Sequence, residues 1–261
     1  MHGLTPLGAA GLFLIGAAAS VFGSLVGLGG GFVVIPVLRL AFGIPPAEVA
    51  GTSLVLVLAN TASSTIGFWR HKTIDFRLAM PFTLGAVPAS ILGVLAVRHF
   101  SPAGFDVAYG AMLVTLAILV IRRRGIESRA AGERNFAHDW RVGVAGGLAM
   151  GFFSSAFGIG GGFVMVPLLL IAARMPPHVV AATTAFVVTM TAPIGIVAHA
   201  LAGDVDWAVT TPLVLGGIAG GGIAPSIAKR VSSPALITML AIGLIGAAIS
   251  LALRHLPIWN R

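Results

Sequence analysis

Residues Gly27–Pro36 read GLGGGFVVIP, and residues Gly158–Pro167 read GIGGGFVMVP. The second copy begins 131 residues after the first, and each copy lies inside a long apolar tract. A glycine in a helix interior costs about 1 kcal/mol relative to alanine, so three in a row do not serve helix stability. They indicate a turn of the backbone or a close approach to it. We therefore predict a broken helix in each half, with a second helix that starts at the break and points its N–H groups and positive dipole end toward it.

The composition is that of a membrane protein. Hydrophobic residues make up 57% and charged residues 9% of the 261 residues, and the mean hydropathy is +1.01. Apolar runs of about 20 residues, the length that spans a bilayer, recur along the chain, and we expect an all-α polytopic fold with about eight spans. The lack of cysteine excludes disulfides and thiolate metal sites. The net charge of +8 fits Lys and Arg kept in cytoplasmic loops, so no nucleic-acid partner is expected.

The similarity between the halves extends well beyond the glycines. Matching residues keep the same displacement without a gap: Pro45-Pro46 and Pro176-Pro177, Asp75 and Asp206, Pro81 and Pro212, Gly85 and Gly216. A gapless register of this length indicates an internal duplication. We predict two homologous four-segment repeats, residues 1–121 and 142–261, joined by a basic loop over residues 122–141 that the positive-inside rule places in the cytoplasm.

Two orientations of the repeats are open. If each glycine-broken tract crosses the membrane once, the repeats are parallel; if it enters and returns to its own side, they are inverted. The loop that carries Arg70, Lys72 and Arg77 in the first half carries Asp204 and Asp206 in the second. Such a swap of loop charge favours opposite orientations. Inverted repeats built around discontinuous helices are common among transporters, and we expect this arrangement.

The glycine breaks predict an anion-binding site near the bilayer midplane, made by two helix N-termini that face each other. The alternative is close helix packing, for which membrane proteins routinely use small residues. The residues expected to contact the anion at the breaks are Ser24, Gly29, Gly30, Gly31, Ser155, Gly160, Gly161 and Gly162.

Polar side chains on the next segment of each half are further candidates. Hydroxyl and amide groups there could donate hydrogen bonds to an anion, although Ser and Thr in membrane helices also bond to their own backbone. Asn60 is the strongest of them, because a primary amide in hydrocarbon is costly unless it is paired. The candidate donors are Thr52, Ser53, Asn60, Thr183, Thr184 and Thr191.

Few ionisable residues lie within the apolar segments. His199 and Glu48 are candidates for coupling transport to a proton, although both lie near segment ends and could instead reach the interface. Arg39 and Arg174 could attract anions, but we interpret them as snorkelling to the lipid headgroups. No Walker motif, metal-ligand cluster or catalytic set is visible, so we expect neither an enzyme nor a cofactor.

The duplicated G-x-GGG-F-x-x-x-P element, the Pro-Pro turn and the Thr-rich second segment together resemble the TauE/SafE sulfite exporter family, also called the 4-toluene sulfonate uptake permease family. The resemblance covers residues 10–253. It implies a secondary carrier for sulfite, organosulfonates or related anions, in the bacterial cytoplasmic (inner) membrane. The signature glycines of the family map onto Gly27 and Gly29–Gly31, and onto Gly158 and Gly160–Gly162.

We therefore expect a secondary transporter, and more specifically an exporter, of small sulfur-containing anions that works by alternating access around the two breaks. A passive anion channel with the same pore is the first alternative. A membrane enzyme or a subunit of a partner complex is the second. The sequence leaves the substrate, the direction of flux, the coupling ion and the oligomeric state open.

Overall fold

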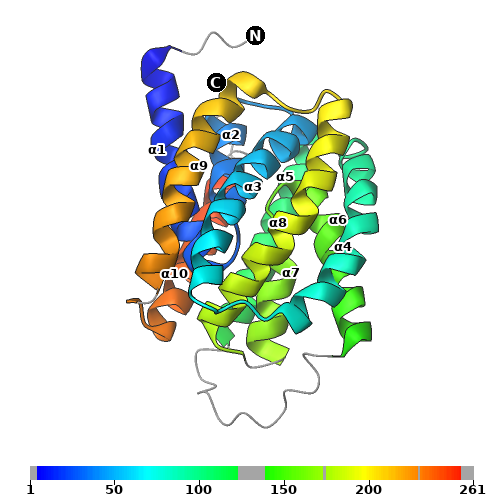
Figure 1. Cartoon of the computed structure of the whole chain (residues 1–261). Coiled ribbons are helices and arrows are strands. Elements are labelled where there is room, and N and C mark those ends of the chain that lie inside the picture. Colours follow the sequence, from blue (N-terminus) through cyan, green and yellow to red (C-terminus); the bar gives the residue numbers. More distant parts are fainter. Residues whose placement is uncertain (1–4, 123–138, 173–174, 229, 254–261) are drawn as a thin grey trace.

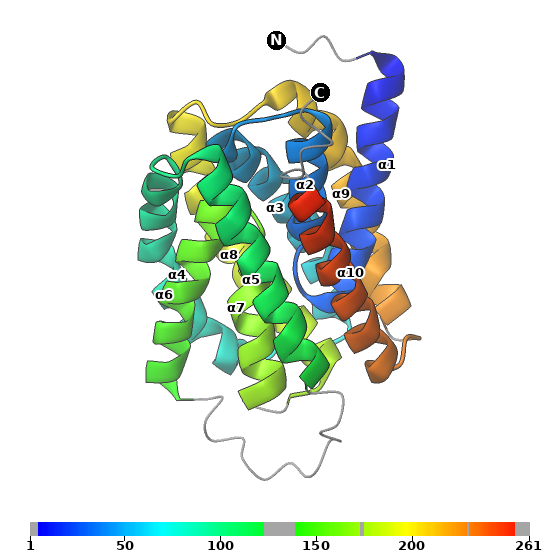
Figure 2. The same cartoon turned by 180° about the vertical axis from the view of Figure 1, so that it is seen from behind.

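The computed structural model describes residues 5–122, 139–172, 175–228 and 230–253, and these residues form a helical bundle without strands (Figures 1 and 2). The all-α prediction is thus confirmed for this part of the chain. Residues 123–138 of the predicted basic loop, and Arg174, lie outside it. The elements are α1 (Pro6–Val26), α2 (Gly31–Ala41), α3 (Pro46–Arg70), α4 (Phe76–Val97), α5 (Pro102–Arg122), α6 (Trp140–Phe157), α7 (Gly162–Pro167), the π-helical η2 (Leu168–Ala172), α8 (Pro177–Leu201), α9 (Trp207–Ala228) and α10 (Ser233–Leu253).

Six helices within the described residues are long and apolar enough to cross a membrane: α1, α3, α4, residues Pro102–Leu119 of α5, α8 and α9. Large apolar side chains on their outer faces are exposed, among them Leu84, Leu92 and Leu215. Such a surface would be unfavourable in water and is matched to lipid. The number of spans predicted from sequence, eight, stays a prediction.

Helix bounds keep the register of the repeated sequence. Helices α3, α4 and α5 begin and end 131 residues before α8, α9 and α10, and α2 occupies the position of α7 together with η2. The equivalent first helices run in opposite directions: α1 starts at the top of Figure 1, near the N-terminus, whereas α6 starts at the lower edge, next to the grey trace.

Helix starts follow from local chemistry. The Asp75 carboxylate caps α4 by accepting a hydrogen bond from the Leu78 N–H at 3.2 Å. Helices α3 and α8 begin at Pro46 and Pro177. The fixed φ of proline suits the first turn, and its lack of an N–H costs nothing there because an N–H in the first turn has no acceptor within the helix.

Helix pairs α1–α9 and α4–α6 approach through glycine. A Cβ added at Gly16 of α1 would overlap the carbonyl oxygen of Leu213 in α9, and a Cβ added at the equivalent Gly147 of α6 would overlap that of Phe82 in α4. Without side chains, the backbones come as close as the small-residue interfaces of membrane helices allow. The two closely packed pairs therefore flank α3 and α8, with α9 in contact with α3 and α4 in contact with α8.

This packing predicts opposite effects at two glycines of α9. Gly220→Ala should lower the free energy of unfolding by about 1–3 kcal/mol, because the new methyl group meets the Ala17 carbonyl of α1. Gly222→Ala should be neutral or stabilising by up to about 1 kcal/mol, since nothing lies within 4 Å and alanine favours the helix. Thermal unfolding of the purified variants in detergent measures both; equal midpoints would contradict the proposed role of Gly220.

Candidate anion-binding site at the two helix breaks

The first break is formed by glycines in left-handed conformations. Helix α1 ends at Val26 and is followed by the C-cap residue Gly27, whose φ is 81° and whose N–H donates to the Gly23 carbonyl oxygen. Gly29 and Gly30 follow with φ values of 76° and 81°. Residues with a side chain rarely adopt this conformation, so the glycines allow the chain to leave α1 and start α2 within a few residues.

The second break differs from the first at one position. Gly158 and Gly160 are left-handed, with φ values of 72° and 78°, but Gly161 is right-handed at −52°. The three atoms nearest to a Cβ added at Gly161 belong to the Met150 side chain, whereas those nearest to one added at Gly30 belong to the backbone of α1. The two copies of one sequence pattern thus fold with different backbones at the third glycine.

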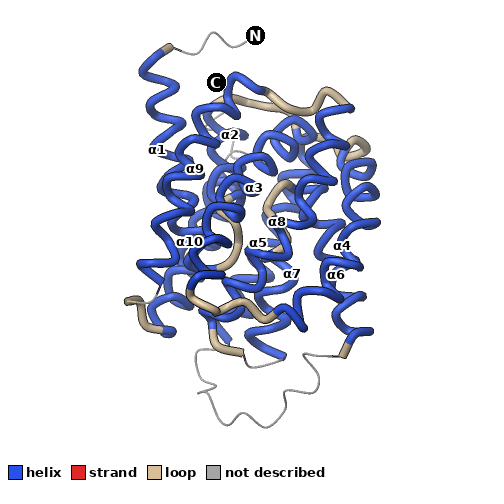
Figure 3. The backbone as a smooth tube through the Cα atoms, viewed as in Figure 1, coloured by secondary structure: helices blue, strands red, loops and turns tan. Residues whose placement is uncertain are grey.

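The two breaks pack directly on each other. A Cβ added at Gly31 would lie 2.5 Å from the Gly158 carbonyl oxygen, and one at Gly162 would overlap the Gly27 carbonyl oxygen. Figure 3 shows the breaks as two loops enclosed by helices, away from both ends of the bundle. Close packing is therefore one role of these glycines, and their role as anion ligands stays a prediction.

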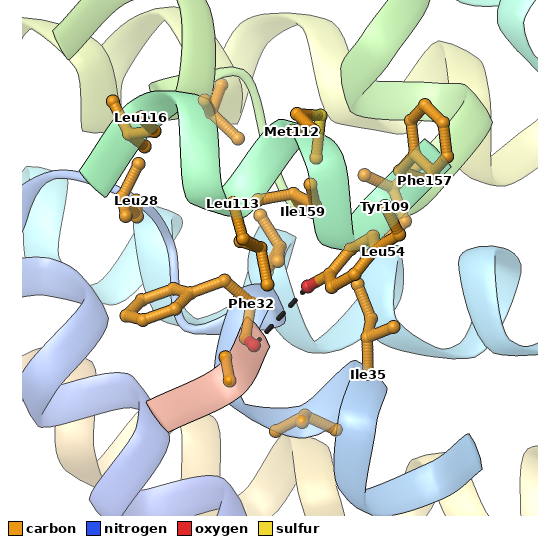
Figure 4. Close-up of a cluster of buried hydrophobic side chains, with 14 of the residues drawn as sticks. Leu28, Phe32, Ile35, Leu54, Tyr109, Met112, Leu113, Leu116, Phe157 and Ile159 are labelled. Atoms are coloured by element: carbon orange, nitrogen blue, oxygen red, sulfur yellow. Dashed lines mark hydrogen bonds between the residues drawn. The ribbon is translucent and has the colours of Figure 1, made fainter. Parts of the chain in front are cut away.

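The second residue of each motif lies in the apolar core. Leu28 and Ile159 are both buried, and both lie in the core cluster that includes Tyr109 of α5 (Figure 4). The Tyr109 hydroxyl donates to the Phe32 carbonyl oxygen at 3.3 Å. Helix α5 is thereby joined to the first turn of α2, just after the break.

Aromatic pairs connect the two helices of each broken tract. Phe22 and Phe32 have ring centroids 5.7 Å apart, and the equivalent Phe153 and Phe163 are 6.0 Å apart. Aromatic pairs at this separation attract each other beyond the area they bury. They stabilise the angle between the helix before the break and the helix after it.

Thr52 and Thr183 form equivalent hydrogen bonds that cross between the halves. Thr52 Oγ1 accepts from the N–H of Asp206 at 3.1 Å, and Thr183 Oγ1 accepts from the N–H of Asp75 at 3.0 Å. Each predicted anion donor thus pairs with the N-cap residue of a helix in the other half. Each bond uses one lone pair of the hydroxyl oxygen. The part of Thr52 and Thr183 in anion binding stays a prediction.

Ser53 lies at the second break. Its hydroxyl is within hydrogen-bond distance of the Gly158 carbonyl oxygen, at 3.0 Å, and of the Ala50 carbonyl oxygen, at 3.2 Å. Thr184 occupies the equivalent position in the second half and is fully buried, but its hydroxyl has no hydrogen-bond partner among the described residues.

Asn60 of α3 joins the end of α1. Its Oδ1 accepts from the Ser24 hydroxyl at 2.6 Å, while its Nδ2 is buried and lacks a partner in the described part of the chain. Thr191, at the equivalent position, donates to the Val187 carbonyl oxygen of its own helix at 2.9 Å. The structure therefore places Ser24 and Asn60 together and leaves Thr191 bonded to its own backbone.

Comparisons with known proteins identify the family. A family model described as "Sulfite exporter TauE/SafE" matches residues 12–251, nearly the whole chain. The chain belongs to this family. It is similar to the probable membrane transporter protein YunE of Bacillus subtilis, with 28% identity over 255 residues that cover 90% of this chain and 93% of that protein.

Two further relatives carry similar names. A probable membrane transporter protein of Xylella fastidiosa (strain 9a5c) is 29% identical over 235 residues, 87% of each chain. Probable membrane transporter protein MJ0441 of Methanocaldococcus jannaschii is 29% identical over 194 residues, 72% of this chain and 71% of that one. No solved structure matches the chain. The predictions of a TauE/SafE membrane transporter, and of a protein that is not an enzyme, are confirmed.

In this TauE/SafE transporter, the His199 side chain is fully buried within the bundle. Its Nε2 donates to the Ser155 carbonyl oxygen at 2.9 Å, and its Nδ1 lies 3.4 Å from Oδ2 of the half-buried Asp204. The exposed Arg98 pairs with the same carboxylate at 3.3 Å. A line of polar groups thus connects the surface to the last turn of α6, just before the second break. Glu48 lies half-buried in the first turn of α3, where the helix dipole favours a carboxylate.

Arg39 corrects an expectation from the sequence. Instead of snorkelling to headgroups, its side chain is 2% exposed and forms a bidentate ion pair with the equally buried Asp106 of α5, at 2.8 and 2.7 Å. It also donates to the Ile44 carbonyl oxygen at 2.8 Å. The only signal in the sequence was the isolated Asp106 in an apolar segment.

The ion pair predicts a stability that depends on both partners. Arg39→Leu should cost about 3–5 kcal/mol, because it removes the guanidinium that neutralises a buried carboxylate. The double variant Arg39→Leu/Asp106→Ile should recover most of the loss, since it reproduces the residues at the equivalent positions, Leu170 and Ile237. Thermal unfolding measures both variants, and a single variant as stable as the parent would contradict the assigned role of the pair.

Proposed function

We propose that this TauE/SafE protein is a secondary transporter that exports small sulfur-containing anions, such as sulfite or organosulfonates, by alternating access around the two glycine breaks. The observation that carries the proposal is the meeting of two discontinuous helices inside the bundle, with Gly31 against the Gly158 carbonyl and buried hydroxyl and amide groups beside them. Discontinuous helices of this kind form the substrate sites of many transporters. The family description supports sulfite as substrate and export as direction.

Neutral donors suit an anion that must also be released. The buried guanidinium nearest in sequence to the first break, Arg39, is committed to Asp106 and two carbonyl oxygens. Hydrogen bonds from hydroxyl, amide and backbone N–H groups can hold sulfite or a sulfonate without a fixed cation. Binding is then weak enough for the anion to leave on the other side of the membrane.

We infer that the halves are inverted repeats, with eight spans and the basic loop in the cytoplasm. Three observations support this inference. Helix bounds in the two halves keep one register, α1 and α6 start at opposite ends of the bundle, and contacts are exchanged between halves. The exchange is clearest in the bonds from Asp206 to Thr52 and from Asp75 to Thr183, which a two-fold axis in the membrane plane would relate.

We also propose that His199 carries the coupling proton. The imidazole faces one carbonyl oxygen and one carboxylate oxygen, so its doubly protonated form can donate to both. The groups that it faces are Asp204, with Arg98 behind it, and the Ser155 backbone of α6. Protonation would strengthen the contact with Asp204 and hold the last turn of α6, and loss of the proton would release it.

Substitution at the breaks tests the central proposal. Gly30→Leu and Gly161→Leu should each reduce sulfite flux in proteoliposomes at least tenfold, because a side chain there displaces the Ala19 backbone or Met150. Both variants should still insert and remain monodisperse. Gly43→Ala is the matched control for Gly30, since Gly43 is also left-handed, at 62°, but a Cβ added there would meet nothing within 4 Å. Unchanged flux in a Gly161→Leu protein would remove the central claim.

Coupling distinguishes a carrier from a channel. The parent protein should accumulate sulfite in vesicles against its gradient when a proton gradient is imposed. His199→Gln should lose this accumulation while it retains downhill flux, because glutamine can hydrogen-bond but cannot exchange a proton. Downhill flux alone in the parent would favour the passive channel, and accumulation by His199→Gln would exclude His199 as the coupling group.

A further inference from the structure

Three buried polar atoms lack a hydrogen-bond partner among the described residues: Ser20 Oγ, Asn60 Nδ2 and Thr184 Oγ1. The side chains of all three residues are fully buried. An unpaired buried donor costs about 1–3 kcal/mol, and folded proteins contain few of them. Each therefore points to a partner that the described residues do not supply.

All three residues lie around the first break. Ser20 is beside Gly30, since a Cβ added at Gly30 would lie 3.4 Å from the Ser20 Cα. Asn60 bonds Ser24 in the last turn of α1. Thr184 lies across the break on α8, one turn after Ala181, whose Cα would be 2.9 Å from a Cβ on Gly27.

The second break has no such set among the described residues. The position equivalent to Ser20 is Gly151, which has no side chain. Thr191, equivalent to Asn60, donates to the Val187 carbonyl oxygen, and Ser53, equivalent to Thr184, is hydrogen-bonded at Gly158. The unpaired groups thus occur at one break, to which both halves contribute, and do not come from the repeated pattern.

Ser20 and Asn60 are close enough to share one ligand. Ser20 and Ser24 are neighbours one turn apart on α1, about 5–6 Å between Cβ atoms, and Asn60 is bonded to Ser24. Helix α9 places glycines beside both residues: a Cβ on Gly217 would lie 3.5 Å from Ser20 Oγ, and one on Gly221 would lie 2.6 Å from Asn60 Oδ1. At the second break the equivalent positions are Ala86 and Ser90.

We propose that the anion binds at the first break alone, off the axis between the halves, with Ser20 Oγ and Asn60 Nδ2 donating to two of its oxygens. This inference rests on the proposed function and names the residues that perform it, including Ser20. An amide nitrogen only donates, so a site that includes Asn60 Nδ2 suits an oxyanion and not a cation.

Binding of sulfite to the purified full-length protein, measured by isothermal titration calorimetry, tests the pair. Ser20→Ala should raise the Kd about tenfold or more, since hydrogen bonds to charged groups are among the stronger ones. Asn60→Asp should raise it further, because a carboxylate repels the anion. Ser90→Ala is the matched control: its hydroxyl is equally buried but is already bonded to the Ala86 carbonyl at 2.8 Å, so sulfite affinity should not change.

Thermal unfolding without anion gives a second readout that a purely structural role would not produce. Ser20→Ala should unfold at the parental temperature or above it, because it removes an unpaired hydroxyl, whereas sulfite should stabilise it less than the parent. Parental affinity in both Ser20→Ala and Asn60→Asp would overturn the inference and leave the proposed function standing. A parent protein that binds neither sulfite nor a sulfonate would overturn both.

Discussion

Backbone contact between the two helix breaks is the constraint on which the structure depends. Gly31 meets the carbonyl of Gly158, and Gly162 meets the carbonyl of Gly27, so neither position can carry a side chain. Non-helical backbone is tolerated at membrane depth only where protein or a polar cavity surrounds it. The bundle meets this condition by placing the breaks against each other. The close glycine contacts of the α1–α9 and α4–α6 pairs, and the aromatic pairs beside each break, help to hold the two breaks in contact.

The two halves share their structural contacts but differ in several of their polar groups. The hydroxyls of Thr52 and Thr183 form the same bond in both halves, and the phenylalanine pairs recur in the same way. Among the described residues, three polar features occur once: the Arg39–Asp106 pair, the line from Arg98 through Asp204 to His199, and the unpaired groups at the first break. Features that build the fold are thus duplicated, while the groups that we propose for selectivity and coupling are not.

The broken helices were predictable because a run of glycines in an apolar tract is incompatible with a stable continuous helix, and the register of the repeat anticipated the helix bounds. Contacts between distant residues were not predictable. Arg39 was misplaced because its partner lies 67 residues away, and the bond from Asp75 to Thr183 spans 108 residues. Ser20, which we propose as an anion ligand, was not a candidate from the sequence. The repeat favoured positions that are polar in both halves, and the counterpart of Ser20 is Gly151. Gly30 and Gly161 share a pattern but differ in φ, which packing decides.

The bonds that cross between Thr52, Thr183 and the two aspartate N–H groups bear on how the protein is made. When the first half has entered the membrane, the Asp75 N–H at the start of α4 still lacks its acceptor, because the Thr183 hydroxyl is synthesised 108 residues later. Its glycine break likewise has no opposite surface. One half of this chain is therefore an incomplete folding unit. The second half must be synthesised before the first can reach its final structure. Fusion into a single polypeptide keeps the two halves together at equal dose, and it ties assembly of the site to completion of translation.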